Sequence, residues 1–269
     1  MKKIILTISF ACLVASGMTA QIKIGKTSIG KGKIEAAQKA AKALTVSDAE
    51  MAEMAAKSIK WMDENNPVCT TKDKDKKKKA YAERLEKIFG PYKNYDGLNL
   101  NYKVYYVTDI NAFASPDGSV RVFSSLMDIM TDDELLGIIG HEIGHVKLGH
   151  SKKAYKQALL TAATTQYAGE TGGSVGSLVN SANIGDFAQA LVEAQFSQTQ
   201  ETAADEYSYT FLVSNGKDPK ALISAFKKLA DLGSGKDSFK DKILSSHPGS
   251  EKRAQNIEKK IEKDSKKKK

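Results

Sequence analysis

The pattern H-E-x-x-H, present here as His141-Glu-Ile-Gly-His145, constrains the fold of this chain more than any other sequence feature. On an α-helix, residues four apart lie one turn apart on the same face, so His141 and His145 would point the same way, with Glu142 beside them. Two imidazoles in this arrangement can ligate zinc, and the neighbouring carboxylate can act as a general base. The pattern therefore predicts a helical zinc site with one zinc ion per chain.

The chain has only two other histidines, His150 and His247. A metzincin would have a glycine three residues after the second histidine of the pattern and another histidine six residues after it. Here Leu148 takes the glycine position and His150 comes one residue too early. The sequence therefore disfavours the metzincin class, and we expect His150 to be a hydrogen-bonded structural residue near the end of the helix.

A zinc hydrolase needs a third protein ligand and keeps the fourth position for water, whose pKa zinc lowers to roughly 7. An acidic residue on a later helix can supply this ligand. We favour Glu201 in the segment Glu201-Thr-Ala-Ala-Asp205. Asp205, one turn further on the same face, would accept a hydrogen bond from one of the two zinc-binding histidines. Glu193 and Glu206 are alternative third ligands.

The N-terminus has the layout of a secretory signal peptide. A basic start is followed by an apolar run from Ile4 to Val14 and by small residues up to Ala20, after which we expect cleavage. The apolar run is shorter than the ~20 residues that a spanning helix needs. Lipidation at Cys12 is not expected, because Ser9 stands where such a signal prefers leucine. The pattern predicts export, either to the periplasm or out of the cell.

The chain is basic, with a formal net charge of +9, and its lysines gather in Lys72–Lys79 and Lys263–Lys269. Charge runs of this kind are typical of a solvated linker and a tail. They allow a weak contact with an anionic membrane surface. Nucleic-acid binding is not expected, because no aromatic residues are interleaved with the lysines. The sequence does not indicate an oligomeric state.

The periodicity of apolar residues predicts a mostly helical α+β fold. Ser47 and Glu50 form a capping box that starts a helix ahead of the lysine run. Apolar and polar residues then alternate from Leu98 to Tyr106, which is typical of a half-buried strand, and a hairpin follows between Asn111 and Phe123. We therefore expect a small antiparallel sheet packed beside the H-E-x-x-H helix.

Start signals and glycines organise the second half of the chain. Thr131 and Glu134 form a second capping box, at the start of the H-E-x-x-H helix. The glycine- and serine-rich segment Gly169–Gly185 lies between the two halves of the expected zinc site, which favours a mobile loop or a lid. The helix after it is expected to end with the acidic cluster Glu201–Glu206.

Four separated motifs occur in an order that is similar to one known family. They are His141-Glu-Ile-Gly-His145-Val followed by His150; Glu201-x-x-Ala-Asp205; His247-Pro248 with Arg253 five residues after the proline; and, upstream, Asn111-Ala-Phe-Ala114 with Asp117-Gly118 and Glu134-Leu135. In these motifs the chain resembles the Ste24/HtpX-like gluzincin metallopeptidases from about Tyr81 to Arg253. Its lack of spanning helices makes it similar to the exported soluble branch, whose members act on polypeptides in the cell envelope.

The resemblance implies a zincin-like fold and a division of the chain. The division is a signal peptide (residues 1–20), an N-terminal helical segment with a lysine-rich linker (21–79), a zinc metallopeptidase domain (80–255) and a lysine-rich tail (256–269).

The resemblance also implies roles for single residues. Glu142 would be the general base and later the proton donor, and Glu201 the third zinc ligand. Asn111, Ala112, Phe113 and Ala114 would form an edge strand that binds an extended substrate through its backbone. His247 would either stabilise the oxyanion or bind zinc as a fourth ligand and exclude water, and these two roles predict opposite effects of its removal. Arg253 completes the last motif.

These features lead to two hypotheses of different classes. The first is an exported zinc endopeptidase that degrades extended or misfolded envelope proteins. The second is a non-proteolytic or latent chaperone or assembly factor that uses the same cleft. Glu142 favours the first hypothesis, because a protein that only binds polypeptides needs no general base.

Overall fold

The computed structural model describes residues 23–24, 27–28, 45–165, 184–233 and 247–267. The expected signal peptide (residues 1–20) lies outside these ranges, and so do residues 169–183 of the expected glycine-rich lid. The helices are α2 (Asp48–Asn65), α3 (Lys76–Phe89), the short 3-10 helix η1 (Gly90–Tyr92), α4 (Ser124–Ile129), α5 (Asp132–Lys147), α6 (His150–Thr165), α8 (Ile184–Val192), α9 (Gln198–Ser214), α10 (Lys220–Gly233) and α12 (Ser250–Lys267). The strands are β1 (Lys23–Ile24), β2 (Thr27–Ser28), β3 (Val68–Cys69), β4 (Asn101–Tyr105), β5 (Ala112–Ala114) and β6 (Ser119–Phe123).

The predicted class is confirmed: the chain is mostly helical, with a small sheet of order β3-β4-β6-β5 beside α5. The expected hairpin is also present, because β5 pairs antiparallel with β6, with Phe113 opposite Arg121. One pair differs from the expectation of an antiparallel sheet, since β4 runs parallel to β6, with Tyr102 opposite Val120. The chain passes from β4 to the outer position of β5, and β6 then returns between the two. The sheet is therefore mixed.

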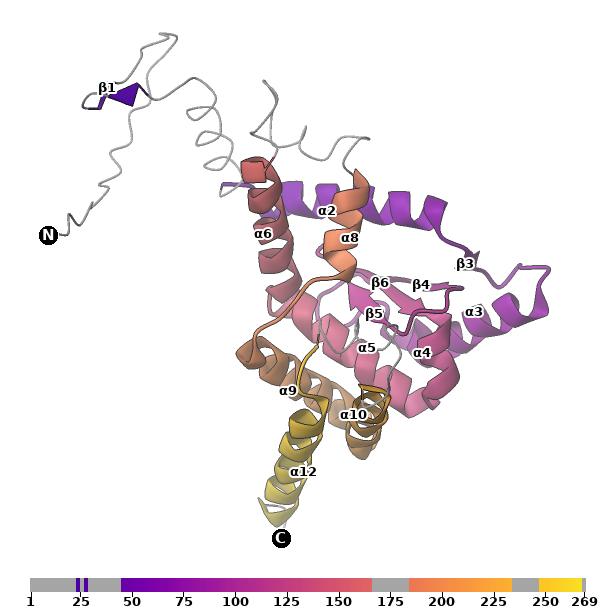
Figure 1. Cartoon of the computed structure of the whole chain (residues 1–269). Coiled ribbons are helices and arrows are strands. Elements are labelled where there is room, and N and C mark those ends of the chain that lie inside the picture. Colours follow the sequence, from indigo (N-terminus) through magenta and orange to yellow (C-terminus); the bar gives the residue numbers. More distant parts are fainter. Residues whose placement is uncertain (1–22, 25–26, 29–44, 166–183, 234–246, 268–269) are drawn as a thin grey trace, which may run out of the picture.

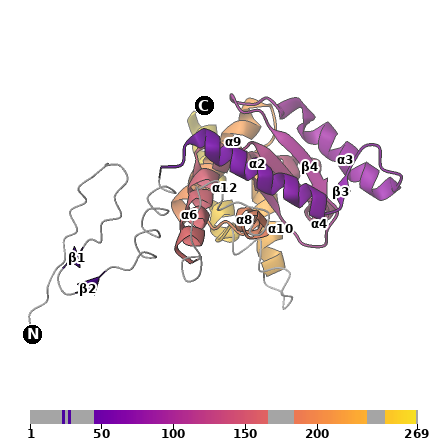
Figure 2. The same ribbon diagram turned by 90° about the horizontal axis from the view of Figure 1, so that it is seen from above.

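The two faces of the sheet are covered by different helices, α2 on one side and α5 on the other (Figures 1 and 2). In β6, Val120 and Val122 pack into the core that contains α5, whereas Phe123 packs into the core that contains α2. β5 alternates in the same way, with Ala114 towards α5 and Phe113 towards α2. Helices pack on both faces of the sheet, and side chains alternate between these faces along a strand. The alternation therefore determines which side chains of β5 face the H-E-x-x-H helix.

Helix α5 begins where the capping box predicted. The Oγ1 of Thr131 accepts a hydrogen bond from the backbone N–H of Glu134 at 3.3 Å, and the backbone N–H of Thr131 donates to Glu134 Oε2 at 2.7 Å. Within the helix, Leu135, Ile138 and Ile139 are buried in the core. Their packing holds α5 in place and so fixes the direction of the face that carries the histidines.

Helix α9 crosses α5 at very short range because glycines of α5 lie at the contact. A Cβ atom built on Gly140 would lie 2.7 Å from Phe211 Cδ1, and one on Gly144 would lie 3.2 Å from the backbone of Ala204. Any larger residue at these positions would push the two helices apart. The glycines therefore allow α9 to bring its first turns next to the H-E-x-x-H segment.

The acidic cluster Glu201–Glu206 lies near the start of α9, so its expected position at the end of a helix was wrong. Ser197 caps α9: its Oγ accepts from the backbone N–H of Gln200, whose side chain accepts from the backbone N–H of Ser197. This capping box has glutamine in place of glutamate, and it determines where the helix begins. As a result, Glu201 enters the core from the first turn of α9.

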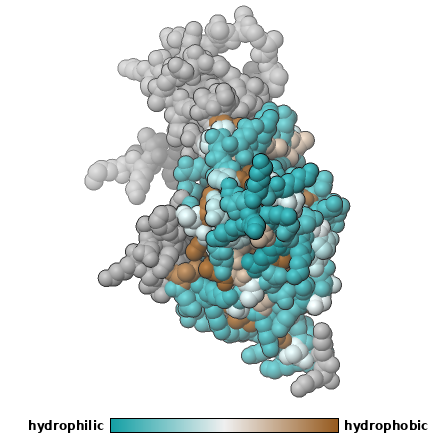
Figure 3. Space-filling model, turned by 90° about the vertical axis from the view of Figure 1, so that its right-hand side faces the viewer, coloured by the Kyte–Doolittle hydropathy of each residue, from teal (hydrophilic) through white to brown (hydrophobic). Residues whose placement is uncertain are grey.

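The described lysines of the two runs are mostly solvent-exposed, as expected, and many of them lie in helices. Asp75 caps α3, whose first turn is Lys76–Lys79, and α12 continues to Lys267. Hydrophilic residues cover most of the face on the side of α3 and β3 (Figure 3). Among the helices that the structure describes, none has the length and apolar character of a membrane span.

Candidate metal centre

Four buried side chains from three parts of the chain converge at one point. His141 and His145 come from α5, Glu201 from the first turn of α9, and His247 from the segment that leads into α12. One potential ligand atom from each residue lies within 4.8 Å of the others. The structure thus brings together the two histidines of the pattern, the favoured third ligand and the histidine of the last motif.

The ring nitrogens and the carboxylate point at one another. The Nε2 atoms of His141 and His145 are 2.9 Å apart. The carboxylate of Glu201 closes the group, with Oε1 3.2 Å from His145 Nε2 and Oε2 3.6 Å from His141 Nε2. Three potential ligands therefore surround a common centre, at separations near those of ligands that share one metal ion.

The outer ring nitrogens of the two α5 histidines have their own partners. Asp205 Oδ1 lies 2.8 Å from His141 Nδ1, and His150 Nδ1 lies 3.0 Å from His145 Nδ1. An N–H at Nδ1 of His141 that donates to Asp205 leaves the lone pair of that ring on Nε2, where it faces the centre. His150 has the structural contact that the sequence indicated, although it begins α6 and does not end α5.

Arg253 of α12 binds the acidic side chains from outside the cluster. Its Nε and Nη2 donate to the two carboxylate oxygens of Asp205 at 2.8 and 2.6 Å, and its Nη1 lies 2.8 Å from Glu201 Oε2. Its guanidinium also lies 4.1 Å from the ring centre of Phe226. This paired geometry fixes the orientation of Asp205 and, through it, the ring of His141.

The ionisation of these groups suits a divalent metal. Burial lowers the pKa of His141 well below its ordinary value and the pKa of His145 to about 4, so both rings are neutral at neutral pH. Burial alone would raise the pKa of Glu201, but hydrogen bonds from His145 and His247 hold it far below its ordinary value. The result is two neutral imidazoles and one carboxylate, which are the ligands that zinc takes in hydrolases.

Two contacts also show that the protein alone leaves this cluster incomplete. When both rings carry their proton on Nδ1, as zinc ligation through Nε2 requires, the facing Nε2 atoms of His141 and His145 are two lone pairs with no donor between them. Glu201 Oε2 is buried and accepts no hydrogen bond, although Arg253 lies near it as an ion-pair partner. A cation at the centre would satisfy these atoms at once, so the residues present fit zinc.

Glu142 lies beside the cluster and next to the sheet. Its carboxylate accepts a hydrogen bond from the backbone N–H of Ala114, and its Oε1 lies 3.5 Å from His247 Nε2. Burial raises the pKa of Glu142 to about 7. A carboxyl group with this pKa can both accept and release a proton at neutral pH.

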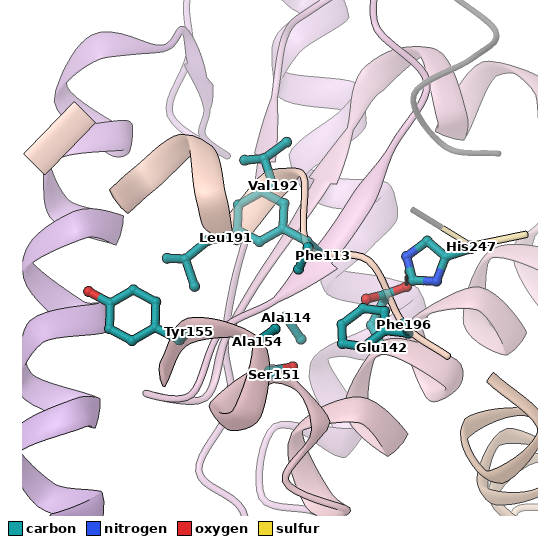
Figure 4. Close-up of a pocket in the computed structure, with 11 residues that line it drawn as sticks. Phe113, Ala114, Glu142, Ser151, Ala154, Tyr155, Leu191, Val192, Phe196 and His247 are labelled. Atoms are coloured by element: carbon teal, nitrogen blue, oxygen red, sulfur yellow. Dashed lines mark ion pairs between the residues drawn. The ribbon is translucent and has the colours of Figure 1, made fainter. Parts of the chain in front are cut away.

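His247, a member of the cluster, lies next to Glu142 (Figure 4). Its Nδ1 is 3.3 Å from His141 Nε2 and 3.1 Å from Glu201 Oε1, whereas its Nε2 faces Glu142. Burial alone would lower the pKa of His247, but the carboxylates of Glu142 and Glu201 raise it above the ordinary value. The ring can therefore interact with the metal ligands on one side and with the candidate base on the other.

Strand β5 runs past the cluster at the edge of the sheet. Among the described strands, β5 pairs only with β6. The backbone N–H and C=O groups of Phe113 point towards β6. In an antiparallel pair the backbone groups alternate in direction, so those of Ala112 and Ala114 turn away from β6. Asn111 begins this segment, with its Oδ1 bonded to the N–H of Ala112 at 2.9 Å. The N–H of Ala114 bonds to Glu142, so the edge offers the carbonyl oxygens of Ala112 and Ala114 to an extended chain.

Two of the residues weighed as zinc ligands lie elsewhere, and one that the sequence did not indicate lies close by. Glu193 and Glu206 are exposed and outside the cluster. Phe196, between α8 and α9, stacks on the ring of His145, with the ring centres 3.7 Å apart and the planes at 20°. A single phenylalanine in a polar loop carries no sequence signal for such a contact.

Comparisons with known proteins match this geometry. The model of the family described as peptidase family M48 matches residues 75–261. The chain is 39% identical to metalloprotease LoiP of Escherichia coli over 92% of this chain and 94% of that protein. It is 37% identical to metalloprotease YcaL of Escherichia coli over 82% of this chain and 83% of that protein. It is 29% identical to the beta-barrel assembly-enhancing protease of Yersinia pestis over 51% of this chain and 30% of that protein.

Proposed function

Because this chain belongs to peptidase family M48 and is a zinc metalloendopeptidase, we propose that it is exported and cuts extended or misfolded proteins of the cell envelope. Export is supported by the signal-peptide layout of residues 1–20. A role in quality control is supported by the similarity to a protease whose name refers to β-barrel assembly. The substrates are polypeptides, and the lysine runs add a weak contact with anionic membrane surfaces.

The observation that carries the proposal is the convergence of His141, His145 and Glu201 beside Glu142. In our proposal the first three residues hold one zinc ion per chain, and Asp205 and Arg253 orient them. Zinc, when bound, supplies a Lewis acid that makes water more acidic and polarises the peptide carbonyl. The protein contributes the fixed ligand directions and a buried site from which bulk water is excluded.

Glu142 moves the proton in this proposal. Its carboxylate takes a proton from the attacking water and passes it to the leaving amine, which requires a group that is readily ionised and readily protonated. The pKa of about 7 that burial gives Glu142 meets this need at neutral pH. The hydrogen bond from the N–H of Ala114 keeps the carboxylate next to the strand on which we place the substrate.

The substrate lies along β5 as an added strand. The backbone carbonyl oxygens of Ala112 and Ala114 can accept hydrogen bonds from any extended peptide, whatever its side chains, whereas the N–H groups of both residues already bond to Asn111 and Glu142. A folded protein cannot present an extended segment of this kind without local unfolding. This mode of binding explains a preference for misfolded or unassembled proteins.

The direct test is the cleavage of unfolded casein by the zinc-loaded full chain and by Glu142→Gln. We expect the wild type to cut casein and the variant to lose activity by a factor on the order of 10²–10⁴, with zinc still bound. Zinc content and activity are measured on the same samples. Full activity in Glu142→Gln would rule out the proposed proton transfer, and a zinc-loaded wild type that cuts nothing would favour the chaperone hypothesis.

A latent state is a second candidate, and the position of His247 favours it. Its Nδ1 lies as close to the ligand atoms as they lie to one another, so it can act as a fourth ligand that keeps water out. In that case His247→Ala raises the turnover of casein, because a position for water becomes free. Turnover that falls in His247→Ala would contradict the latent state and support a role of His247 at the oxyanion.

A further inference from the structure

The two histidines of α5 are supported by different partners. The outer ring nitrogen of His141 faces the carboxylate of Asp205 at 2.8 Å, and Arg253 holds that carboxylate with two hydrogen bonds. The outer ring nitrogen of His145 faces the imidazole of His150 at 3.0 Å. A carboxylate accepts a stronger hydrogen bond than a neutral imidazole does. By hydrogen bonds alone, His145 is therefore held less firmly than His141.

A second contact holds the ring of His145, and it comes from Phe196. The two rings lie nearly face to face, with their centres 3.7 Å apart and their planes at 20°. By comparison, the rings of His141 and Phe226 are 6.5 Å apart and nearly perpendicular, at 81°. A stacked ring resists rotation of the imidazole about its Cβ–Cγ bond, because that rotation would bring the two rings into collision. The stack therefore keeps both nitrogens of His145 directed at their partners.

The start of α9 sets the position of Phe196. The residue immediately precedes Ser197, the N-cap of α9, whose backbone N–H donates to the side chain of Gln200 at 3.0 Å. An apolar residue at this place in a helix start often packs on an apolar residue five positions later. Here that position holds Glu201, the third ligand, and the ring of Phe196 lies on His145 instead. The start of α9 thus carries one ligand and the ring that covers another.

Phe196 packs on the metal centre and lies outside the cores of the fold. It is partly buried, and it belongs to neither of the two hydrophobic cores in the described part of the chain. It lies at the wall of a small pocket together with Glu142 and His247 (Figure 4), and its ring centre is 5.5 Å from that of His247. An aromatic ring that packs on histidines of the site contributes more to the site than to the stability of the fold.

The stack also favours the zinc-bound form of His145 over the zinc-free form. A metal ion is a Lewis acid, so it withdraws electrons from the imidazole that it binds and leaves that ring more positive. The face of a phenylalanine ring is negative, and it attracts a positive group more strongly than a neutral one. The contact with Phe196 is therefore stronger when His145 holds zinc.

We propose that Phe196 is a positioning residue of the metal centre, whose ring holds the imidazole of His145 in the orientation that binds zinc and thereby raises the zinc affinity of the chain. The inference rests on the proposed ligand set, in which His145 is a ligand. It requires no contact between Phe196 and the substrate. An aromatic contact of this kind corresponds to roughly a three- to tenfold change in an equilibrium constant.

The test is the zinc affinity of the full chain, measured by titration with a competing chelator. Phe196→Leu keeps an apolar side chain but lacks the ring face, so we expect the affinity to fall roughly three- to tenfold. Phe196→Tyr keeps the ring and should stay within about twofold of the wild type. Gln195→Ala, an exposed neighbour in the same segment, is the control and should equal the wild type. Wild-type affinity in Phe196→Leu, or an equal loss in Phe196→Tyr, would overturn the proposal.

Two further measurements separate positioning from packing. With Co²⁺ in place of zinc, the visible absorption spectrum reports the geometry of the ligands, and we expect it to change in Phe196→Leu and to be retained in Phe196→Tyr. Urea unfolding of the zinc-free protein should give nearly the same stability for the wild type and Phe196→Leu, because the ring lies outside both cores. Lower stability of zinc-free Phe196→Leu with an unchanged cobalt spectrum would reduce Phe196 to a packing residue and refute the proposal.

The ligand set is tested separately from the role of Phe196. A wild type that binds no zinc, or a His145→Ala variant that binds it with wild-type affinity, contradicts the proposed ligands and with them the role of Phe196. Loss of zinc in His145→Ala together with wild-type affinity in Phe196→Leu contradicts the positioning role alone.

Discussion

Two clusters of buried or partly buried charged side chains lie on opposite faces of the sheet, and they differ in how their polar atoms are paired. On the α2 side, Asp63 accepts hydrogen bonds from Arg121 Nε and Nη2 at 2.9 Å each, from Lys103 at 2.7 Å and from the hydroxyl of Tyr105 at 2.8 Å. Each carboxylate oxygen of Asp63 faces donors only. The protein completes this cluster by itself.

On the α5 side, two imidazole rings and a carboxylate converge on one point. The Nε2 atoms of His141 and His145 face each other at 2.9 Å, and Glu201 Oε1 lies 3.2 Å from the second of them. Asp205 and His150 pair with the outer ring nitrogens, and Arg253 pairs with Glu201 Oε2. The comparison teaches that buried charge by itself does not mark a functional site. Neutral imidazoles and a carboxylate that converge on one point mark a place for a cation.

The comparison is tested most strongly by removing the carboxylate of Asp63 on the α2 side. Asp63→Asn leaves the buried guanidinium of Arg121 without its charge partner, so we expect the free energy of unfolding to fall by about 3 kcal/mol. Zinc content should stay at one per chain, because no zinc-site residue is touched. Urea unfolding and metal analysis of the same variant check both statements.

The matched control is Lys103→Met, which removes a partner of Asp63 that is 40% exposed. An exposed pair contributes less than about 1 kcal/mol, so this variant should lose far less stability than Asp63→Asn. Equal losses in the two variants would contradict the structural role assigned to the buried Asp63–Arg121 pair.

A smaller effect is expected when the outer support of the second cluster is weakened. Asp205→Asn keeps the size of the side chain but removes the charge that orients His141 and binds Arg253. We expect zinc affinity to fall by about 10- to 100-fold. Titration with a competing chelator measures this change. An affinity equal to that of the wild type would mean that His141 needs no acceptor to orient its ring.

Local patterns in the sequence were sufficient for features within one helix. The capping box of Thr131 fixed the start of α5, and the four-residue spacing of His141 and His145 placed both rings on one face. Glu201 and Asp205 follow the same rule within α9. The meeting of α5 and α9 was expected from the need for a third, acidic ligand and was also implied by the family resemblance, and Gly140 and Gly144 allow it physically.

Contacts between distant segments could not be predicted in this way. The parallel pairing of β4 with β6 depends on the path of the connection, and periodicity within each strand does not report that path. Arg121 and Asp63 are 58 residues apart, and no pattern in the sequence around either residue indicates that they pair. Phe196 on His145 is a similar case, because the sequence shows only an isolated aromatic residue.

The central claim is that Glu201 completes the zinc site with His141 and His145, and metal analysis of two variants tests it most directly. Glu201→Ala removes the buried carboxylate, and Glu206→Ala removes an exposed one from the same helix. After dialysis of each full-length protein against zinc-free buffer, we predict one zinc per chain in the wild type and in Glu206→Ala, and almost none in Glu201→Ala. Zinc retained by Glu201→Ala and lost from Glu206→Ala would contradict the account.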